Sequence, residues 1–161
     1  MGGLSGIDYD VDTDTCILVS DERSRHNAAR FYRAFLDYDR EGFKAVELYE
    51  LNYFSRQSGD GRQGDEIIDI EDIRFDPSDG SIWYVSEGDR RLGLNLSIRQ
   101  ATAKGELIRE LLPDPMFSMH ADRELGPRNN LSFEGLSFSQ DKQSLWVAME
   151  ALSTPPLLTQ F

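Results

Sequence analysis

The sequence predicts an all-β fold, a β-propeller fragment of about two and a half four-stranded antiparallel blades. One seventeen-residue module occurs three times, at residues 5–21, 71–87 and 134–150. The copies start 66 and then 63 residues apart, a spacing typical of repeated supersecondary units. Each module has the pattern strand, turn, strand, and further strand patterns follow the first two copies. Together these observations indicate successive blades of one fold.

Each module is predicted to form a β-hairpin. In the second copy, Ile73 and Phe75 alternate with polar residues, and 76–81 (DPSDGS) supplies the proline and glycine of a tight turn. The next residues, 82–85 (IWYV), are all aromatic or β-branched, as strands favour. The other two modules are expected to turn at 10–15 and at 139–144.

Outer strands are predicted after the first two modules, at 31–38, 45–53, 94–101 and 106–112. A helix over 27–36 is the alternative for the first of these ranges, because it contains two adjacent alanines. The blade pattern favours a strand from Phe31 onward. Long loops are expected at 55–65, which is polar and rich in glycine, and at 114–130.

We expect one partial domain over 1–161, with a first blade at about 4–54, a second at about 70–113 and part of a third at about 131–152. A ring needs more blades than this to close. The sequence therefore predicts either a piece of a larger propeller or a chain completed by a second copy. Its open sheet edges would allow self-association.

The composition restricts the class of partner. The chain has 17 basic and 29 acidic residues, a formal charge of −12. Nucleic acid is excluded as a partner, because binding to phosphates needs a basic face. The charge fits cation binding or simply an acidic surface. The sequence shows neither an apolar run long enough for a membrane span nor a signal peptide, so it leaves the compartment undetermined.

Acidic residues stand at the ends of the modules. In the second copy, a centred turn pairs Ile73 with Val85 and Glu71 with Glu87, although the turn type can shift this register by a residue or two. If the modules are the inner strands of successive blades, their ends meet at one rim of the central channel. The carboxylates expected to converge there are Asp21, Glu71, Glu87, Glu134 and Glu150.

This rim of carboxylates predicts a metal site. Like charges held close together raise one another's pKa unless a cation neutralises them. Ca²⁺ suits the site better than Mg²⁺, because it accepts about six to eight oxygen ligands in a loose geometry. The sequence argues against zinc, since His26 and His120 lack the spacing of ligands and Cys16 stands alone. Acids that are merely solvated at strand ends are the alternative.

Arginines follow the first of these acids. Arg23, Arg25 and Arg30 either hold an anionic substrate group or form ion pairs with neighbouring carboxylates.

The chain resembles the phytase-like family, whose domain is described as esterase-like activity of phytase. The stretches that carry the resemblance are 2–7 (GGLSGI), 20–23 (SDER), 30–32 (RFY), 71–76 (EDIRFD), 82–88 (IWYVSEG), Asn130, 133–136 (FEGL) and 148–151 (AMEA). Asp72 and Ser132 depart from it, because the family usually has glycine at both positions. The usual domain is also longer, so this chain alone is expected to be inactive if further blades carry part of the site.

The resemblance implies a β-propeller, periplasmic or secreted, that hydrolyses ester or phosphoester substrates with a carboxylate-bound divalent metal, Ca²⁺ by analogy with the β-propeller phytases. A non-catalytic propeller that binds a ligand or a protein, with at most structural calcium, is the alternative. Carried over by position, the resemblance makes Asp21, Glu71, Glu87, Glu134 and Glu150 metal ligands, Glu71, Glu87 and Arg23 catalytic residues, and Arg23 and Asn130 substrate-binding residues.

Overall fold

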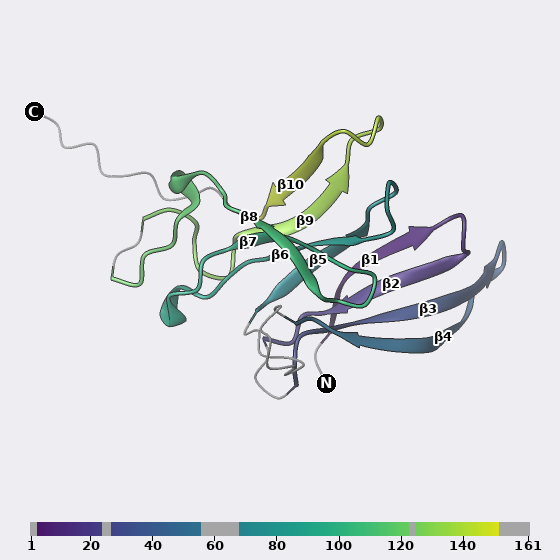
Figure 1. Cartoon of the computed structure of the whole chain (residues 1–161). Coiled ribbons are helices and arrows are strands. Elements are labelled where there is room, and N and C mark those ends of the chain that lie inside the picture. Colours follow the sequence, from purple (N-terminus) through teal and green to yellow (C-terminus); the bar gives the residue numbers. More distant parts are fainter. Residues whose placement is uncertain (1–2, 24–26, 56–67, 123–124, 152–161) are drawn as a thin grey trace, which may run out of the picture.

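The computed structural model describes residues 3–23, 27–55, 68–122 and 125–151, and its regular elements are almost all strands (Figure 1). Two short 3₁₀ helices, η1 (Arg90–Leu92) and η2 (Pro115–Phe117), are the exceptions among the described residues, and no helix there is long and apolar enough to cross a bilayer. The predicted all-β class is confirmed. Most of the loop expected at 55–65 falls outside the described residues. The strands are β1 (Leu4–Asp10), β2 (Thr15–Ser20), β3 (Arg30–Asp39), β4 (Gly42–Tyr53), β5 (Ile70–Phe75), β6 (Ile82–Ser86), β7 (Ser97–Ala101), β8 (Leu107–Leu111), β9 (Phe133–Phe138) and β10 (Leu145–Met149).

The strands form three antiparallel sheets in chain order, β1-β2-β3-β4, β5-β6-β7-β8 and β9-β10. Their β1–β2, β5–β6 and β9–β10 turns all point to the upper right in Figure 1. Four antiparallel strands in simple meander order are the content of one propeller blade, and the structure has the fold class that the sequence predicts. The segment from Phe31 onward belongs to β3, so the helical alternative for 27–36 is wrong.

The first strand of each sheet is the inner one, since β5 lies against both β1 and β9. The second strands, β2 and β6, are buried along their whole length. Their sequences, TCILVS and IWYVS, are rich in the β-branched and aromatic residues that suit a strand with both faces covered. This packing places the beginnings of β1, β5 and β9 at one end of the molecule.

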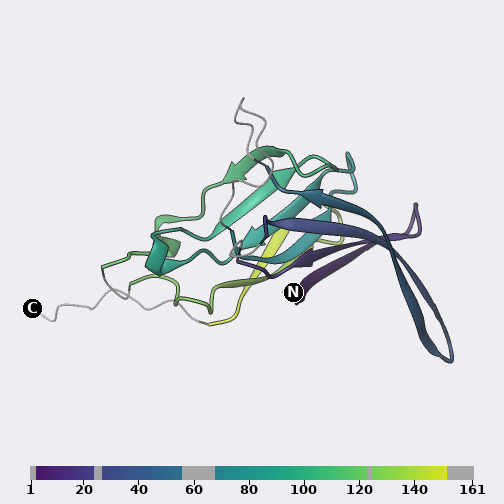
Figure 2. The same cartoon turned by 90° about the horizontal axis from the view of Figure 1, so that it is seen from below.

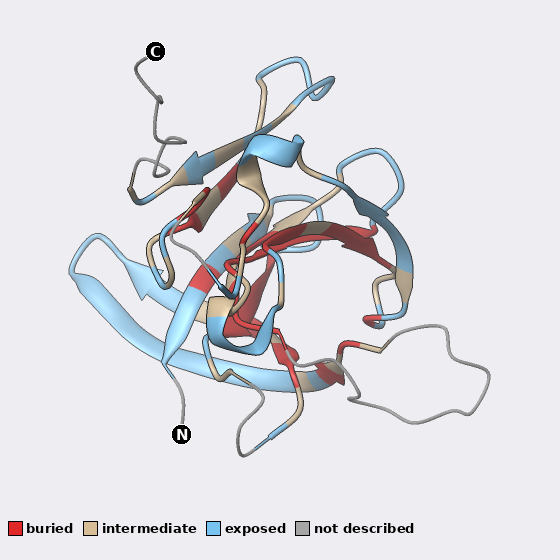
Figure 3. Ribbon diagram, turned by 90° about the vertical axis from the view of Figure 1, so that its left-hand side faces the viewer, coloured by how far each residue is buried: buried red, intermediate tan, exposed pale blue. Residues whose placement is uncertain are grey.

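Two apolar cores separate the sheets. Between the first and second sheets, Phe31 and Ile17 belong to the same cluster as Ile73 and Tyr84. Between the second sheet and β9–β10, Trp83 and Val85 of β6 belong to a cluster with Phe133 and Leu136 of β9. The second sheet is therefore covered on both faces over β5, β6 and β7, whereas β8 is mostly exposed. Figure 3 shows buried strands in the interior of the molecule and exposed ones at its outside.

The β3–β4 hairpin extends beyond these cores. Figure 2 shows it projecting far from the rest of the molecule. Strand β4 is exposed from Gly42 through Glu47. Near the tip of the hairpin, the large side chains of Tyr38 in β3 and Phe43 in β4 are each 63% exposed.

The pairing of the inner hairpins differs from the predicted register by one residue. Ile73 pairs with Tyr84 rather than Val85, and the ladder shifts between Ile70 and Asp72. The shift leaves Glu71 as the extra residue of a β-bulge, so it does not pair with Glu87. The other two inner strands shift at the equivalent positions, and the bulged residues of the three modules are Ser5, Glu71 and Glu134.

Because of the bulges, the last acid of each module forms its backbone hydrogen bond with a different residue from the one predicted. The amide of Glu87 donates to the carbonyl of Asp69, 3.1 Å away, and the equivalent bonds run from Asp21 to Gly3 and from Glu150 to Ser132. The residue two places before each bulge therefore lies opposite the module's last acid. In the second sheet this residue is itself an acid.

One aspartate of β5, Asp72, joins the three inner strands next to the bulge of the second module. The buried carboxylate of Asp72 accepts a hydrogen bond from the amide of Leu136 in β9, with a distance of 2.8 Å. On its other side Gly6 of β1 approaches so closely that a Cβ there would lie 2.8 Å from the Cα of Asp72. Only glycine fits this contact, which holds the three inner strands in close register.

Candidate metal and substrate site

A compact group of carboxylates lies at the bulged end of the second sheet. Asp69, Glu71 and Glu87 each offer one oxygen, and these oxygens all lie within 4.8 Å of one another. Asp69 and Glu87 are buried, and Glu71 is partly exposed. We call these three residues the acidic cluster.

Backbone geometry positions each member of the acidic cluster. The amide of Asp69 donates to Ser86 Oγ at 3.1 Å, which ties the start of β5 to the end of β6. Glu71 is the extra residue of the bulge, so its side chain leaves the regular alternation of the strand. The carbonyl of Glu87 accepts a bond of 2.9 Å from Ser132 Oγ, so the segment before β9 also supports the site.

Arg23 links the first sheet to the acidic cluster. Its Nε lies 2.6 Å from Asp69 Oδ2 and its Nη2 lies 3.1 Å from Glu87 Oε1. The arginine side chain is 28% exposed, whereas that of Glu87 is 2% exposed. One guanidinium thus orients two carboxylates from the side of the first sheet. Of the predicted alternatives for Arg23, ion pairing is present; Arg30 likewise pairs with Glu22, and Arg25 lies outside the described residues.

One oxygen of the acidic cluster lacks a partner. Glu87 Oε2 is buried and accepts no hydrogen bond. A buried carboxylate oxygen without a donor is costly, and a proton or a cation would remove the cost. When Glu87 is protonated, it can donate to Asp69, which is one reason for its raised pKa.

The acidic cluster holds protons to unusually high pH. Burial, helped by the charges of Asp69, Glu134 and Asp21, raises the pKa of Glu71 to about 7. Burial, the hydrogen bond to Asp69 and the charge of Glu71 raise the pKa of Glu87 to about 8. Burial also raises the pKa of Asp69, against the lowering effect of Arg23. The single positive charge of Arg23 does not balance three carboxylates, so protons or a further cation must neutralise part of their charge at neutral pH.

The other predicted rim acids do not belong to the acidic cluster, although the charges of Glu134 and Asp21 act on Glu71. Burial and then the charge of Glu150 raise the pKa of Glu134. Asp21 is exposed, but its charge contributes to the raised pKa of Glu71. Asn130, predicted to bind substrate, has an exposed side chain and a backbone φ of 60°, and it does not line the pocket described below.

The donor set fits a hard divalent cation. Every candidate ligand is a carboxylate oxygen, one of them buried without a hydrogen-bond partner. Carboxylates suit calcium, magnesium or manganese, whereas zinc prefers histidine and cysteine. Neither Cys16 nor His120 belongs to this or any other candidate metal group among the described residues.

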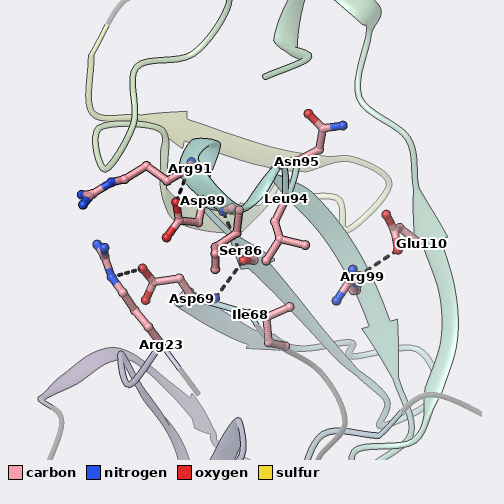
Figure 4. A pocket seen from close by; sticks show the side chains of 13 residues that line it. Arg23, Ile68, Asp69, Ser86, Asp89, Arg91, Leu94, Asn95, Arg99 and Glu110 are labelled. Carbon is pink, nitrogen blue, oxygen red and sulfur yellow. Dashed lines mark hydrogen bonds and ion pairs between the residues drawn. The ribbon is translucent and has the colours of Figure 1, made fainter. Parts of the chain in front are cut away.

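A pocket of about 540 Å³ opens beside the acidic cluster, a size typical of small-molecule sites (Figure 4). Asp69 and Arg23 lie at one side of it, and the ion pair between Arg99 and Glu110 lies across it. The remaining lining residues are Ile68, Ser86, Gly88, Asp89, Arg91, Leu92, Gly93, Leu94 and Asn95.

The sequence prediction missed Asp69, which lies two residues before the second module. A signal is present in the sequence, because Asp69 and Glu71 flank the apolar Ile70, and strand alternation places both on the face opposite to that side chain. The bulge changes this simple alternation, and only its position shows that Asp69 lies opposite Glu87.

The comparison with known families agrees with the resemblance. The model of a family named Phytase-like, described as "Esterase-like activity of phytase", matches residues 1–155. No curated protein matches the sequence.

Proposed function

Because this chain belongs to the phytase-like family, we propose that it hydrolyses ester or phosphoester substrates at the acidic cluster. The observation that carries the proposal is the grouping of Asp69, Glu71 and Glu87, with oxygens within 4.8 Å of one another, beside a pocket of substrate size. Perturbed carboxyl groups next to a pocket are typical of functional sites.

Asp69, Glu71 and Glu87 would hold a divalent cation, and the outer acids would add negative potential around it. We expect Ca²⁺, because it accepts carboxylate oxygens in a loose geometry and so tolerates ligands from a bulge and from two strand ends. A bound cation of this kind polarises an ester or phosphoryl oxygen and makes nearby water more acidic.

Glu71 is the candidate general base. It is partly exposed, so water can reach its carboxylate, and the oxygen that it does not offer to the cation can accept a proton. Glu87 is too deeply buried for this role and is instead suited to holding the cation. Arg23 orients Asp69 and Glu87, and its exposed part can donate to an anionic oxygen of the substrate.

The proposal is tested by turnover of p-nitrophenyl phosphate and p-nitrophenyl acetate, with Ca²⁺ and with EDTA. We expect turnover with Ca²⁺ that falls by at least about a hundredfold in the Glu71→Gln variant, as general acid–base catalysis contributes about that much. Glu47→Gln, an exposed change on β4, is the matched control and is expected to keep full activity. Equal turnover in the Glu71→Gln and Glu47→Gln proteins would refute this mechanism.

A non-catalytic role is the second candidate, and the contact of Arg23 favours it. Arg23 lies between β2 and β3 of the first sheet, while its two carboxylate partners flank β5 and β6 of the second, so a cation here would also strengthen the junction between sheets. A rise in melting temperature with Ca²⁺, without turnover of either ester, would support this structural role.

A further inference from the structure

The pocket beside the acidic cluster has a chemically divided wall. Ile68 and Leu94 point into it in Figure 4, from the segment before β5 and the segment after η1. Leu92 adds another apolar side chain at the exposed rim. The part of the pocket away from the acidic cluster therefore offers apolar surface, which suits a hydrocarbon body of a ligand.

The charged groups of the pocket differ in whether they are already paired. Arg99 is buried and lies 3.0 Å from Glu110, and Arg23 is held by the acidic cluster. Arg91 is exposed, and its guanidinium forms no hydrogen bond or ion pair with the residues that the structure describes. Its backbone amide donates to Asp89 at the start of η1, which places the side chain at the pocket without engaging its charge.

Arg91 extends from η1 on the side of the pocket from which Arg23 enters (Figure 4). An anionic group placed beside the acidic cluster would thus have a guanidinium with free donors within the same pocket. Guanidinium groups suit the oxygens of phosphate, which they can bind with two parallel hydrogen bonds.

The same charges disfavour a densely phosphorylated ligand. The pocket is lined by three arginines and three acids, Asp69, Asp89 and Glu110, and two of the arginines are committed to ion pairs. The whole chain carries a formal charge of −12. Phosphate groups beyond the first would meet apolar side chains or carboxylates, so their desolvation would gain no compensating contact.

We propose that this pocket binds a monophosphate ester of a small apolar alcohol, with Arg91 holding the phosphate and Ile68 and Leu94 packing against the alcohol moiety. A polyphosphorylated substrate is not accommodated. This inference rests on the proposed function for the position of the reacting group, but it concerns binding and can be measured without turnover.

Calorimetric titration with phenylphosphonate, which has no ester bond to hydrolyse, tests the proposal in the presence of Ca²⁺ and in EDTA. We expect Arg91→Gln to weaken binding by about tenfold, as the loss of one hydrogen bond to a charged group predicts, while Arg40→Gln in the β3–β4 turn has no effect. Methylphosphonate should bind about tenfold more weakly than phenylphosphonate, and Leu94→Asn should remove most of that difference. Phytate should bind no more tightly than phenylphosphonate.

Equal affinities of the Arg91→Gln and Arg40→Gln proteins for phenylphosphonate, or tighter binding of phytate, would overturn the inference. These results are separable from those for the proposed function. Phenylphosphonate binding that depends on Arg91, in a protein without turnover, would refute the hydrolase and retain the pocket assignment. Turnover of p-nitrophenyl acetate that depends on Glu71, without any effect of Arg91 on phosphonate binding, would do the reverse.

Discussion

Replacing Glu87 by glutamine is expected to remove a pH-dependent destabilisation of the metal-free protein. In the folded chain the pKa of Glu87 is raised from 4.5 to about 8. The folded state therefore keeps this proton while the unfolded state loses it. Stability from this group is complete below about pH 4.5 and is lost as the pH rises towards and through 8. In Glu87→Gln the amide stays neutral and can still donate to Asp69 as the protonated acid does.

The size of the effect follows from the two pKa values. With 4.5 in the unfolded chain and about 8 in the folded protein, linkage predicts a loss of about 3 kcal/mol in the free energy of unfolding between about pH 5.5 and about pH 8.5. Because the side chain is 2% exposed, little solvent screening reduces this value.

Urea unfolding in EDTA at the two pH values measures this difference. Wild type and the exposed control Glu47→Gln should lose about 3 kcal/mol more than Glu87→Gln between the lower and the higher pH. If Glu87→Gln shows the same loss as wild type, Glu87 does not titrate in this range, and the argument for a proton or cation at its unpartnered oxygen fails.

Three further predictions concern the cation, the bridging arginine and the junction of the inner strands. Millimolar CaCl₂ should raise the melting temperature more at pH 8 than at pH 6, because the acidic cluster must lose protons to bind a cation, and a calcium effect independent of pH would contradict this. Arg23→Gln should lower the free energy of unfolding by about 2 kcal/mol at pH 8 in EDTA, since it leaves two buried carboxylates unpaired, and by less at pH 5, where Glu87 is protonated; equal losses would argue against the ion pairs. Gly6→Ala should cost about 1 to 3 kcal/mol in urea unfolding because its Cβ meets the backbone of Asp72, whereas Gly3→Ala, which meets only a side chain, should cost less.

The strands were predictable because their signals are local. β6 (Ile82–Ser86) begins with four aromatic or β-branched residues, and the turn before it contains Pro77 and Gly80, so neighbours in the sequence decide both elements. The first part of 27–36 was ambiguous for the same reason, because its alanines favour a helix. In the structure Phe31 enters the core between two sheets, and that burial outweighs the helical preference.

The register of the inner hairpins was not predictable to the residue. A centred turn pairs Glu71 with Glu87, but the bulge at Glu71 shifts the pairing and brings Asp69 opposite Glu87 instead. The bulge lies where β5 contacts both neighbouring inner strands, so its position depends on residues far away in the chain.

The sequence alone predicted the three modules, the order of the strands and a group of acids at one rim. Each of these features follows from local pattern and from repetition. The tertiary structure decided which acids meet. It brought Asp69 into the acidic cluster, left Asp21, Glu134 and Glu150 outside it, and placed Arg23 across two carboxylates of the next sheet. It also built the pocket from segments far apart in the chain. Distances of a few ångströms between carboxylates depend on bulges and on packing between sheets, and both arise only when distant segments come together.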